Sequence, residues 1–249
     1  MGIRERLRAS AIGRWLGDES PMSTRCSHDV YRLLPRRINL LAKGVYSHPL
    51  FQEELEASLK HYSGGDFIDV GAAHGTYCFY LAEKASVGAR FLACEPDPIA
   101  FKRLLSNLSA LQDAYPKMTF MPICAGVGDG SPIEFEFPMG REYHPRVVSR
   151  KNATGPLSIT VDRLVSDYGL NPCFVKVDVE GAEVFVLRGM SDTLTRLKPI
   201  VMLELHPLFQ PDGVSPNDLI ENMKSLGYTL ISEVAEEVAT RTLWVPNCS

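Results

Sequence analysis

The sequence predicts an α/β protein with a doubly wound, mostly parallel sheet, which ends in an antiparallel hairpin and follows an N-terminal helical extension. From Gly64 onward, short apolar runs alternate with segments whose apolar residues recur at helical spacing. This alternation favours a parallel sheet with helices on both faces. The last two apolar runs have no helix between them and are expected to pair antiparallel. A chain of 249 residues, 45% of them hydrophobic, suffices for one such domain and its extension.

The first half of the expected sheet contains three strands and two helices. Each strand is a short apolar run, and the first of them closes with a glycine. Asp97 is expected to cap the second helix, with Pro98 in its first turn and a leucine-rich apolar face behind it. The strands are expected over residues 66–71, 90–95 and 119–125, and the first helix over 75–85.

An insertion is expected between the two halves of the sheet. Residues 132–137 alternate strictly between apolar and polar side chains, which indicates an exposed strand. Residues 138–156 contain prolines, glycines and several basic residues, and are expected to form a polar, basic loop.

The second half supplies four more strands. A helix between the second and third of them is expected to start at Ser215, with Asp218 completing a capping box, and to end at Gly227. The strands of this half are expected over residues 173–179, 199–205, 228–233 and 238–245.

The chain is expected to divide into a basic helical extension or lid over residues 1–62 and an α/β domain over 63–249. Residues 1–43 hold nine basic and four acidic side chains. A basic amphipathic helix over residues 3–16 could touch an anionic membrane, but a lid or a solvated tail is the favoured interpretation. Further helix is expected over residues 28–62, with an apolar stripe of Phe51, Leu55 and Leu59.

Bulk composition favours a cytoplasmic protein that does not bind nucleic acid. The pI is near 5.9 and the formal net charge is −4. No stretch approaches the ~20 apolar residues of a membrane span, and the basic N-terminus lacks the apolar core of a signal peptide. The six cysteines are scattered, which favours reduced thiols over a disulfide framework or a metal cluster. The oligomeric state is left open.

The strongest local signal is the loop between the first strand and the first helix, Asp69-Val70-Gly71-Ala72-Ala73-His74-Gly75. In an open α/β sheet, ligands bind beyond the carboxyl ends of the strands at the switch point, and glycines there let the backbone approach them. This spacing suits a ligand without a pyrophosphate. Asp69 could accept from an ammonium group of such a ligand, while a tight structural turn is the alternative interpretation.

Glu95 ends the second strand, twenty positions after Gly75. A carboxylate at this place can accept both hydroxyls of a ribose. It would repel a 2′-phosphate, which disfavours NADP, whereas NAD stays possible on this residue alone.

Charged residues also follow two later strands. Period-two alternation points Lys176, Asp178 and Glu180 to one side, at the end of a strand expected beside the first. Glu204 and His206 close the next strand on the same rim. Charges in a strand otherwise fit for burial are costly unless they pair or bind something. These residues are therefore candidates for a site, with a Lys176–Asp178 ion pair as the structural alternative.

His206 is the candidate base, because a histidine can take a proton from an acceptor hydroxyl at neutral pH. A buried, fully bonded histidine is the alternative. The carboxylates of Asp178, Glu180 and Glu204 could orient the imidazole, or bind a divalent cation that acidifies the hydroxyl. Their spacing matches no recognised ligand motif, so no metal is expected.

Four stretches resemble the FkbM family of S-adenosylmethionine-dependent methyltransferases: FIDVGAAHGTY, ACEPDP, TVDRLVSDYGLNPCFVKVDVEGAEVFVLRGM and MLELHP. The resemblance implies a class I methyltransferase fold with a seven-stranded, Rossmann-like sheet. It also implies S-adenosylmethionine as cofactor and methyl transfer to a hydroxyl of a small acceptor, such as a sugar, a glycolipid or a polyketide-like metabolite. By the same resemblance, the cofactor-binding residues are Asp69, Gly71, Ala72, Ala73, Gly75, Glu95 and Asp178, and the catalytic residues are Asp178, Glu180, Glu204 and His206.

Two features depart from the family pattern. Ala73-His74 replaces an Asn-containing loop that is common in the family, which puts the cofactor contacts there in doubt. The basic segment 141–151 and the arginine-rich head look particular to this chain. They could recognise an anionic acceptor, or they could be solvated surface charges.

Two other functions remain as alternatives. A NAD-dependent oxidoreductase or epimerase would need a Tyr-x-x-x-Lys pair, and the pair at Tyr80 and Lys84 lies on the helix after the glycine loop, the wrong place for it. A non-catalytic cofactor-binding partner protein is the second alternative, although both acidic rim motifs are retained.

Overall fold

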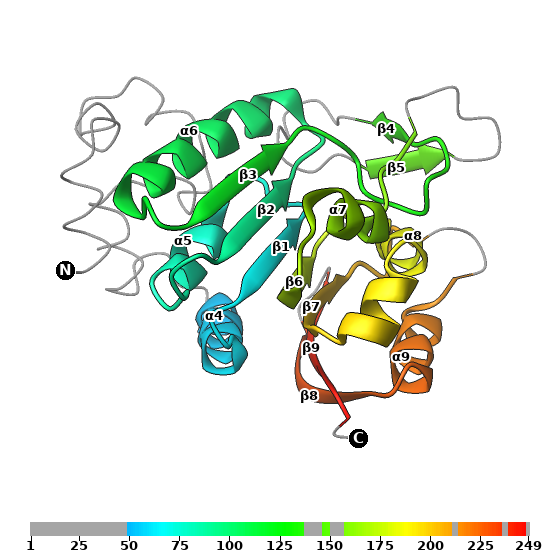
Figure 1. The fold of residues 1–249 in the computed structure, drawn as a ribbon. Coiled ribbons are helices and arrows are strands. Elements are labelled where there is room, and N and C mark those ends of the chain that lie inside the picture. Colours follow the sequence, from blue (N-terminus) through cyan, green and yellow to red (C-terminus); the bar gives the residue numbers. More distant parts are fainter. Residues whose placement is uncertain (1–48, 137–145, 150–156, 211–213, 236–238, 248–249) are drawn as a thin grey trace.

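The computed structural model describes residues 49–136, 146–149, 157–210, 214–235 and 239–247, which form an α/β fold around a seven-stranded sheet (Figure 1). The strand order is β3-β2-β1-β6-β7-β9-β8. Neighbours from β3 to β7 are parallel, and β9 is antiparallel to both β7 and β8. The predicted fold class is confirmed. The strands are β1 (Asp66–Val70), β2 (Arg90–Cys94), β3 (Thr119–Ile123), β6 (Pro172–Val177), β7 (Ile200–Leu205), β8 (Tyr228–Ala235) and β9 (Thr240–Pro246).

Helices cover both faces of the sheet. In Figure 1, α4, α5 and α6 lie on one side and α7, α8 and α9 on the other, and each group packs on its own apolar core. The central strand β1 is buried along its whole length, as expected for a parallel strand between two helical layers. The helices are α4 (Pro49–His61), α5 (Thr76–Ala82), α6 (Pro98–Ala114), α7 (Val161–Tyr168), α8 (Glu183–Arg188), the π-helix η3 (Thr193–Leu197) and α9 (Pro216–Ser225).

The helix starts predicted from capping residues are confirmed. The Asp97 side chain accepts from the Ile99 amide, and Pro98 occupies the first turn of α6. Ser215 and Asp218 form the reciprocal capping box of α9. Each bond satisfies an amide that the helix itself leaves without a partner, which fixes where the helix begins.

The insertion departs from the prediction. Residues 138–156 are not loop throughout, because β5 (Arg146–Ser149) pairs antiparallel with β4 (Glu134–Glu136) in a separate two-stranded sheet (Figure 1). Val147 and Val148 are β-branched and favour a strand, and the expected strand over 132–137 supplies its partner. The basic residues of this segment led to the prediction of a loop instead of a strand.

The N-terminal predictions fall largely outside the described residues. Helix α4 confirms the last part of the helix expected over 28–62, and Leu55 of its apolar stripe is buried in the core. The helix over 3–16, the arm or lid and the boundary between 62 and 63 stay predictions. In the described part of the chain, every helix is too short or too polar to cross a membrane.

The sheet places the candidate site. Strand β1 lies between β2 and β6, so the chain leaves β1 in one direction along the sheet and returns on its other side. The loops that follow β1 and β6 therefore start side by side at the switch point, where α/β proteins bind ligands.

Candidate active site

The loop after β1 is packed tightly against the end of β6. Gly71 has φ +76°, and a Cβ there would lie 1.7 Å from the carbonyl oxygen of Asp178. The amides of Gly71 and Ala72 donate to the Cys94 carbonyl at 3.1 and 2.9 Å, which ties the loop to the end of β2. Glycine is thus required at position 71 both by its backbone conformation and by the neighbouring chain.

Glu95 supports this loop from the end of β2. One of its oxygens accepts from the Ala73 amide and the other from the Asp97 amide, each at 2.8 Å. Burial raises the pKa of Glu95 to about 7, against the opposing effect of these two hydrogen bonds. The carboxylate therefore braces Ala73, which has φ +47°, beside the place where the sequence predicts a ribose.

The rim of the site has two halves, one at the carboxyl ends of β1 and β2 and one at the carboxyl ends of β6 and β7. Lys176 connects them. Its Nζ donates to the Gly71 carbonyl at 2.7 Å and lies 3.1 Å from Asp178 Oδ2 and 3.5 Å from Asp69 Oδ1. It also lies 5.5 Å from the centre of the Tyr77 ring. Burial alone would lower the pKa of Lys176, but the carboxylates of Asp178 and Asp69 raise it above its ordinary value. Lys176 thus stays charged and joins the loops after β1 and β6.

The ion pair expected between Lys176 and Asp178 is present, and Asp69 is a second partner of the same lysine. The Asp69 side chain is only 1% exposed, whereas that of Asp178 is 28% exposed. Burial raises the pKa of Asp69 despite the nearby lysine. The predicted contact between Asp69 and a ligand ammonium stays a prediction. Within the protein, Asp69 forms an ion pair with Lys176.

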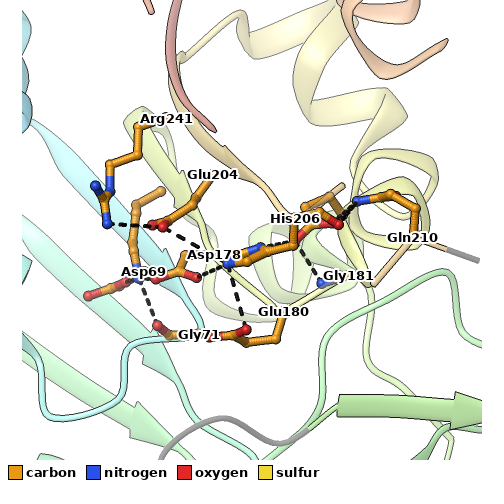
Figure 2. Close-up of polar contacts among 11 residues, drawn as sticks. Asp69, Gly71, Asp178, Glu180, Gly181, Glu204, His206, Gln210 and Arg241 are labelled. Carbon is orange, nitrogen blue, oxygen red and sulfur yellow. Dashed lines mark hydrogen bonds and ion pairs between the residues drawn. The ribbon is translucent and has the colours of Figure 1, made fainter. Parts of the chain in front are cut away.

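A second cluster, which we call the carboxylate–histidine cluster, lies at the carboxyl ends of β6 and β7 and consists of Asp178, Glu180, Glu204 and His206 (Figure 2). The His206 Nε2 lies 3.7 Å from Glu180 Oε2, 3.9 Å from Asp178 Oδ1 and 3.9 Å from Glu204 Oε1. Strand β6 ends at Val177, two residues before the expected end, so Asp178 and Glu180 come from a turn. All four predicted catalytic residues are brought together.

The charges of this cluster set its protonation. Burial would lower the pKa of His206, but its contact with Glu183 and the charges of Asp178 and Glu180 raise it to about 9. Burial and the charge of Asp178 raise the pKa of Glu204 to about 7. Without a ligand, the imidazole is therefore held in its protonated form at neutral pH.

Three residues of the site were missed by the sequence analysis. Glu183, the first residue of α8, lies 2.8 Å from His206 Nδ1, and Gln210 donates to the same carboxylate. Arg241 on β9 lies 3.1 Å from Glu204 Oε1. Glu183 is the last residue of the stretch VKVDVEGAE, which the sequence analysis singled out. Strand alternation ends at the turn before it, however, and so could not predict where its side chain points. Arg241 enters the site only because β9 pairs with β7.

The donor atoms of Asp178, Glu204 and His206 lie within 4.8 Å of one another, close enough to surround a cation. Two of them already have cationic partners in the protein, Lys176 for Asp178 and Arg241 for Glu204. These ion pairs explain why the acidic side chains can lie close together without a metal cation between them. The expectation that the site uses no metal stays a prediction.

His74, which departs from the family pattern, is a completely buried residue of the loop. Asn107 donates to its carbonyl at 2.8 Å, and Arg103 lies 3.3 Å from its Nε2. Burial and the charge of Arg103 lower the pKa of His74 to about 3, so the ring is neutral. Its place between the loop and α6 indicates a packing role.

Comparison with known proteins agrees with this geometry. Residues 69–230 match the model of the methyltransferase FkbM domain. The chain is 34% identical over 153 residues to the hexuronic acid methyltransferase AglP of Haloferax volcanii, covering 61% of this chain and 58% of that protein.

Among solved structures, the chain resembles the methyltransferase FkbM from Methylobacillus flagellatus KT, with a TM-score of 0.51 and 18% identity. The match covers 94% of this chain and 58% of that one, so the chain spans less than two thirds of the length of both relatives. The family match covers most of the α/β domain, from the Asp69 loop through the carboxylate–histidine cluster to β8. The chain belongs to the FkbM methyltransferase family.

Proposed function

We propose that the protein transfers a methyl group from S-adenosylmethionine to a hydroxyl oxygen of a sugar that carries a carboxylate. The observation that carries the proposal is the meeting of buried and half-buried acids and one histidine at the carboxyl ends of β1, β2, β6 and β7. The sugar class is supported by the relative from Haloferax volcanii, which is a hexuronic acid methyltransferase.

The residues of the rim fit the cofactor by charge. Five carboxylates belong to Asp69, Asp178, Glu180, Glu183 and Glu204, and in the described part of the chain Lys176, Arg241 and the protonated His206 form ion pairs with them. An excess of negative charge on buried and half-buried side chains favours a cationic ligand. A sulfonium with an ammonium group is such a ligand, whereas the pyrophosphate of NAD would add negative charge.

In this proposal each half of the rim holds one part of the cofactor. The loop over Gly71, Ala72, Ala73 and Gly75 passes beside the nucleoside, with Glu95 at the ribose. Asp69 and Asp178 attract the positive charge of the methionyl part. Bound there, S-adenosylmethionine supplies an electrophilic methyl group.

The chain's own contribution to the reaction is alignment and proton removal. His206 Nε2 faces the carboxylates of Asp178 and Glu180, whose side chains are 28% and 17% exposed and are therefore the parts of the cluster that a ligand reaches. We assign the hydroxyl proton to Nε2, with Glu204 beside it. Alignment of the two reactants supplies much of the acceleration, and proton removal adds about 10²–10⁴-fold.

The acceptor is tested by supplying the protein with methyl-labelled S-adenosylmethionine and a panel of sugars. Glucuronides and galacturonides are compared with the matched neutral glucosides and galactosides. The expected result is label on a hydroxyl oxygen of a uronic acid and little label on the neutral sugars. Label on neutral sugars alone would contradict the acceptor class, and absence of label from every hydroxyl compound of a metabolite extract would contradict methyl transfer.

The two alternatives are separated by binding and by turnover. Calorimetric titration with S-adenosylhomocysteine and with NAD is expected to give heat with the first ligand alone. Binding of NAD alone would favour the oxidoreductase. A partner protein without activity would bind S-adenosylhomocysteine but methylate nothing.

A further inference from the structure

Glu183 is a completely buried carboxylate to which the mechanism above gives no role. Its Oε1 accepts from the Gly181 amide at 2.9 Å and lies 2.8 Å from His206 Nδ1. Its Oε2 accepts from the side-chain amide of Gln210. Figure 2 shows His206 between the two sides of this arrangement, with Gln210 on one side and the carboxylates of the cluster on the other.

The surroundings fix the relative position of this carboxylate and the imidazole. Gly181 has φ +100°, and a Cβ there would lie 2.2 Å from the Phe209 carbonyl oxygen, so the turns after β6 and β7 are in close contact. The Phe209 ring is stacked on the His206 ring, with centroids 6.2 Å apart and an angle of 22° between the planes. Neither Glu183 nor His206 can therefore turn away without moving a packed turn.

The two nitrogens of the imidazole meet different surroundings. Nδ1 has a carboxylate at hydrogen-bond distance, whereas Nε2 has its carboxylate neighbours at 3.7–3.9 Å, beyond that distance. A carboxylate beside Nδ1 keeps a proton on that nitrogen. In the neutral ring, the lone pair is then on Nε2, on the side of Asp178 and Glu180.

We propose that Glu183 is a positioning residue that keeps the proton of neutral His206 on Nδ1 and directs the Nε2 lone pair toward the acceptor hydroxyl. This inference rests on the proposed function for its chemistry. In the transfer step, the acceptor oxygen bonds to the methyl carbon, and the electrons of the broken carbon–sulfur bond stay on sulfur. The hydroxyl proton passes to Nε2, and Glu183 stabilises the imidazolium that forms. The proton then leaves to solvent.

The neutral imidazole must be available for this step. In the part of the chain that the structure describes, the charged groups around it are Asp178 and Glu180 from the turn after β6, Glu183 from α8 and Glu204 from β7, with Lys176 and Arg241 behind them. Their net negative charge holds the pKa of His206 near 9 in the protein alone. A cationic ligand beside Asp178 offsets that charge and releases the proton from Nε2, while Glu183 continues to hold the one on Nδ1.

The test is nitrogen-15 magnetic resonance of the histidine rings in the full-length protein without ligand, titrated from pH 6 to pH 11. The His206→Asn variant identifies the His206 signals. The expected wild-type result is a neutral ring with its proton on Nδ1. A neutral ring with its proton on Nε2 would overturn the proposal, and this readout needs neither a substrate nor a Glu183 variant.

Two matched variants separate positioning from charge. Glu183→Gln and Glu180→Gln each remove one negative charge beside His206, so each is expected to lower its pKa. Glu183→Gln alone is expected to mix the two tautomers, and to lower kcat about 10–10²-fold with the KM for S-adenosylmethionine unchanged. Glu180→Gln is expected to keep the proton on Nδ1. Equal tautomer populations in the two variants would overturn the proposal.

Failure of the inference and failure of the proposed function give different results. If wild-type protein transfers no methyl group but keeps the Nδ1 proton, the function is wrong and the pair is real. If methyl transfer proceeds with the proton on Nε2, the function stands and Glu183 does not position the base.

Discussion

The two halves of the rim are held together by different kinds of contact. On the β1–β2 side, backbone groups dominate: Gly71 fits against the Asp178 carbonyl, and Glu95 accepts from two amides. On the β6–β7 side, His206 and Glu204 are held by charged side chains whose protonation depends on one another. The first half is therefore sensitive to the volume of its residues, with Glu95 as a titratable group, whereas the second depends on the charges of several neighbouring side chains. In the proposed function, the first half lies beside the nucleoside and the second beside the reacting atoms.

We call the half at β1 and β2 the steric half. The largest loss of stability is expected there, from a single methyl group added at Gly71. In Gly71→Ala, the added Cβ would lie 1.7 Å from a backbone oxygen, in addition to the strain of φ +76°. We expect a loss of more than about 4 kcal/mol in the free energy of unfolding, measured by urea denaturation. Gly88→Ala is the matched control, because Gly88 has φ +88° and nothing within 4 Å of its Cβ position. It is expected to cost about 1–2 kcal/mol. Equal losses in the two variants would contradict the steric account.

Kinetics should separate the two halves next. His206→Ala is expected to lower kcat about 10²–10⁴-fold with little change in cofactor affinity, because in the proposed mechanism His206 removes a proton during the transfer step. Glu95→Ala is expected to weaken cofactor binding more than it lowers kcat. Steady-state rates and calorimetric Kd values for S-adenosylhomocysteine check both. Normal turnover by His206→Ala across pH 6–9 would show that His206 is not the base.

We call the half at β6 and β7 the charged half. Its raised pKa values are expected to make the folded state less stable as the pH rises. The pKa of Glu204 is about 7 in the folded protein and 4.5 in a model peptide, so its contribution to stability is complete below pH 4.5 and is lost as the pH rises through 7. Glu204→Gln is expected to remove part of the fall in unfolding free energy between pH 5 and pH 7.5, by about 1–3 kcal/mol. The exposed Glu221→Gln serves as control. An unchanged slope in Glu204→Gln would contradict the raised pKa.

Cofactor binding is expected to couple to the protonation of His206. His206 has a pKa of about 9, so it is mostly protonated at pH 8 and a cation beside Asp178 should displace part of a proton. The affinity for S-adenosylmethionine is therefore expected to rise between pH 7 and pH 9, by up to about tenfold. Calorimetry in buffers of different ionisation enthalpy measures the released proton. Equal release with the uncharged sulfur of S-adenosylhomocysteine would assign the proton to another cause.

The sequence predicted the steric half well because the sequence signals for it are local. The sharp turn at Gly71, the cap at Asp97 and the acid at the end of β2 each lie within a few residues of the strand or helix that they complete. The parallel sheet followed from the alternation of strands and helices, and the terminal hairpin from its missing helix.

The charged half was predicted only in part because its contacts are tertiary. Alternation grouped Asp178 with Glu180, but nothing local relates Glu183 to His206, 23 positions away, or Arg241 to Glu204. Alternation also gave no indication that Asp69 and Asp178 share Lys176. Such pairings depend on which strands become neighbours, and on turns such as Gly181 that reverse the direction of a side chain.

The most direct measurement is a crystal structure of the protein with S-adenosylhomocysteine. The account predicts the ribose hydroxyls at Glu95, the glycine loop against the nucleoside, and the sulfur on the side of Asp178 that faces His206 Nε2. A ligand bound elsewhere on the molecule, or one whose sulfur points away from His206, would contradict it.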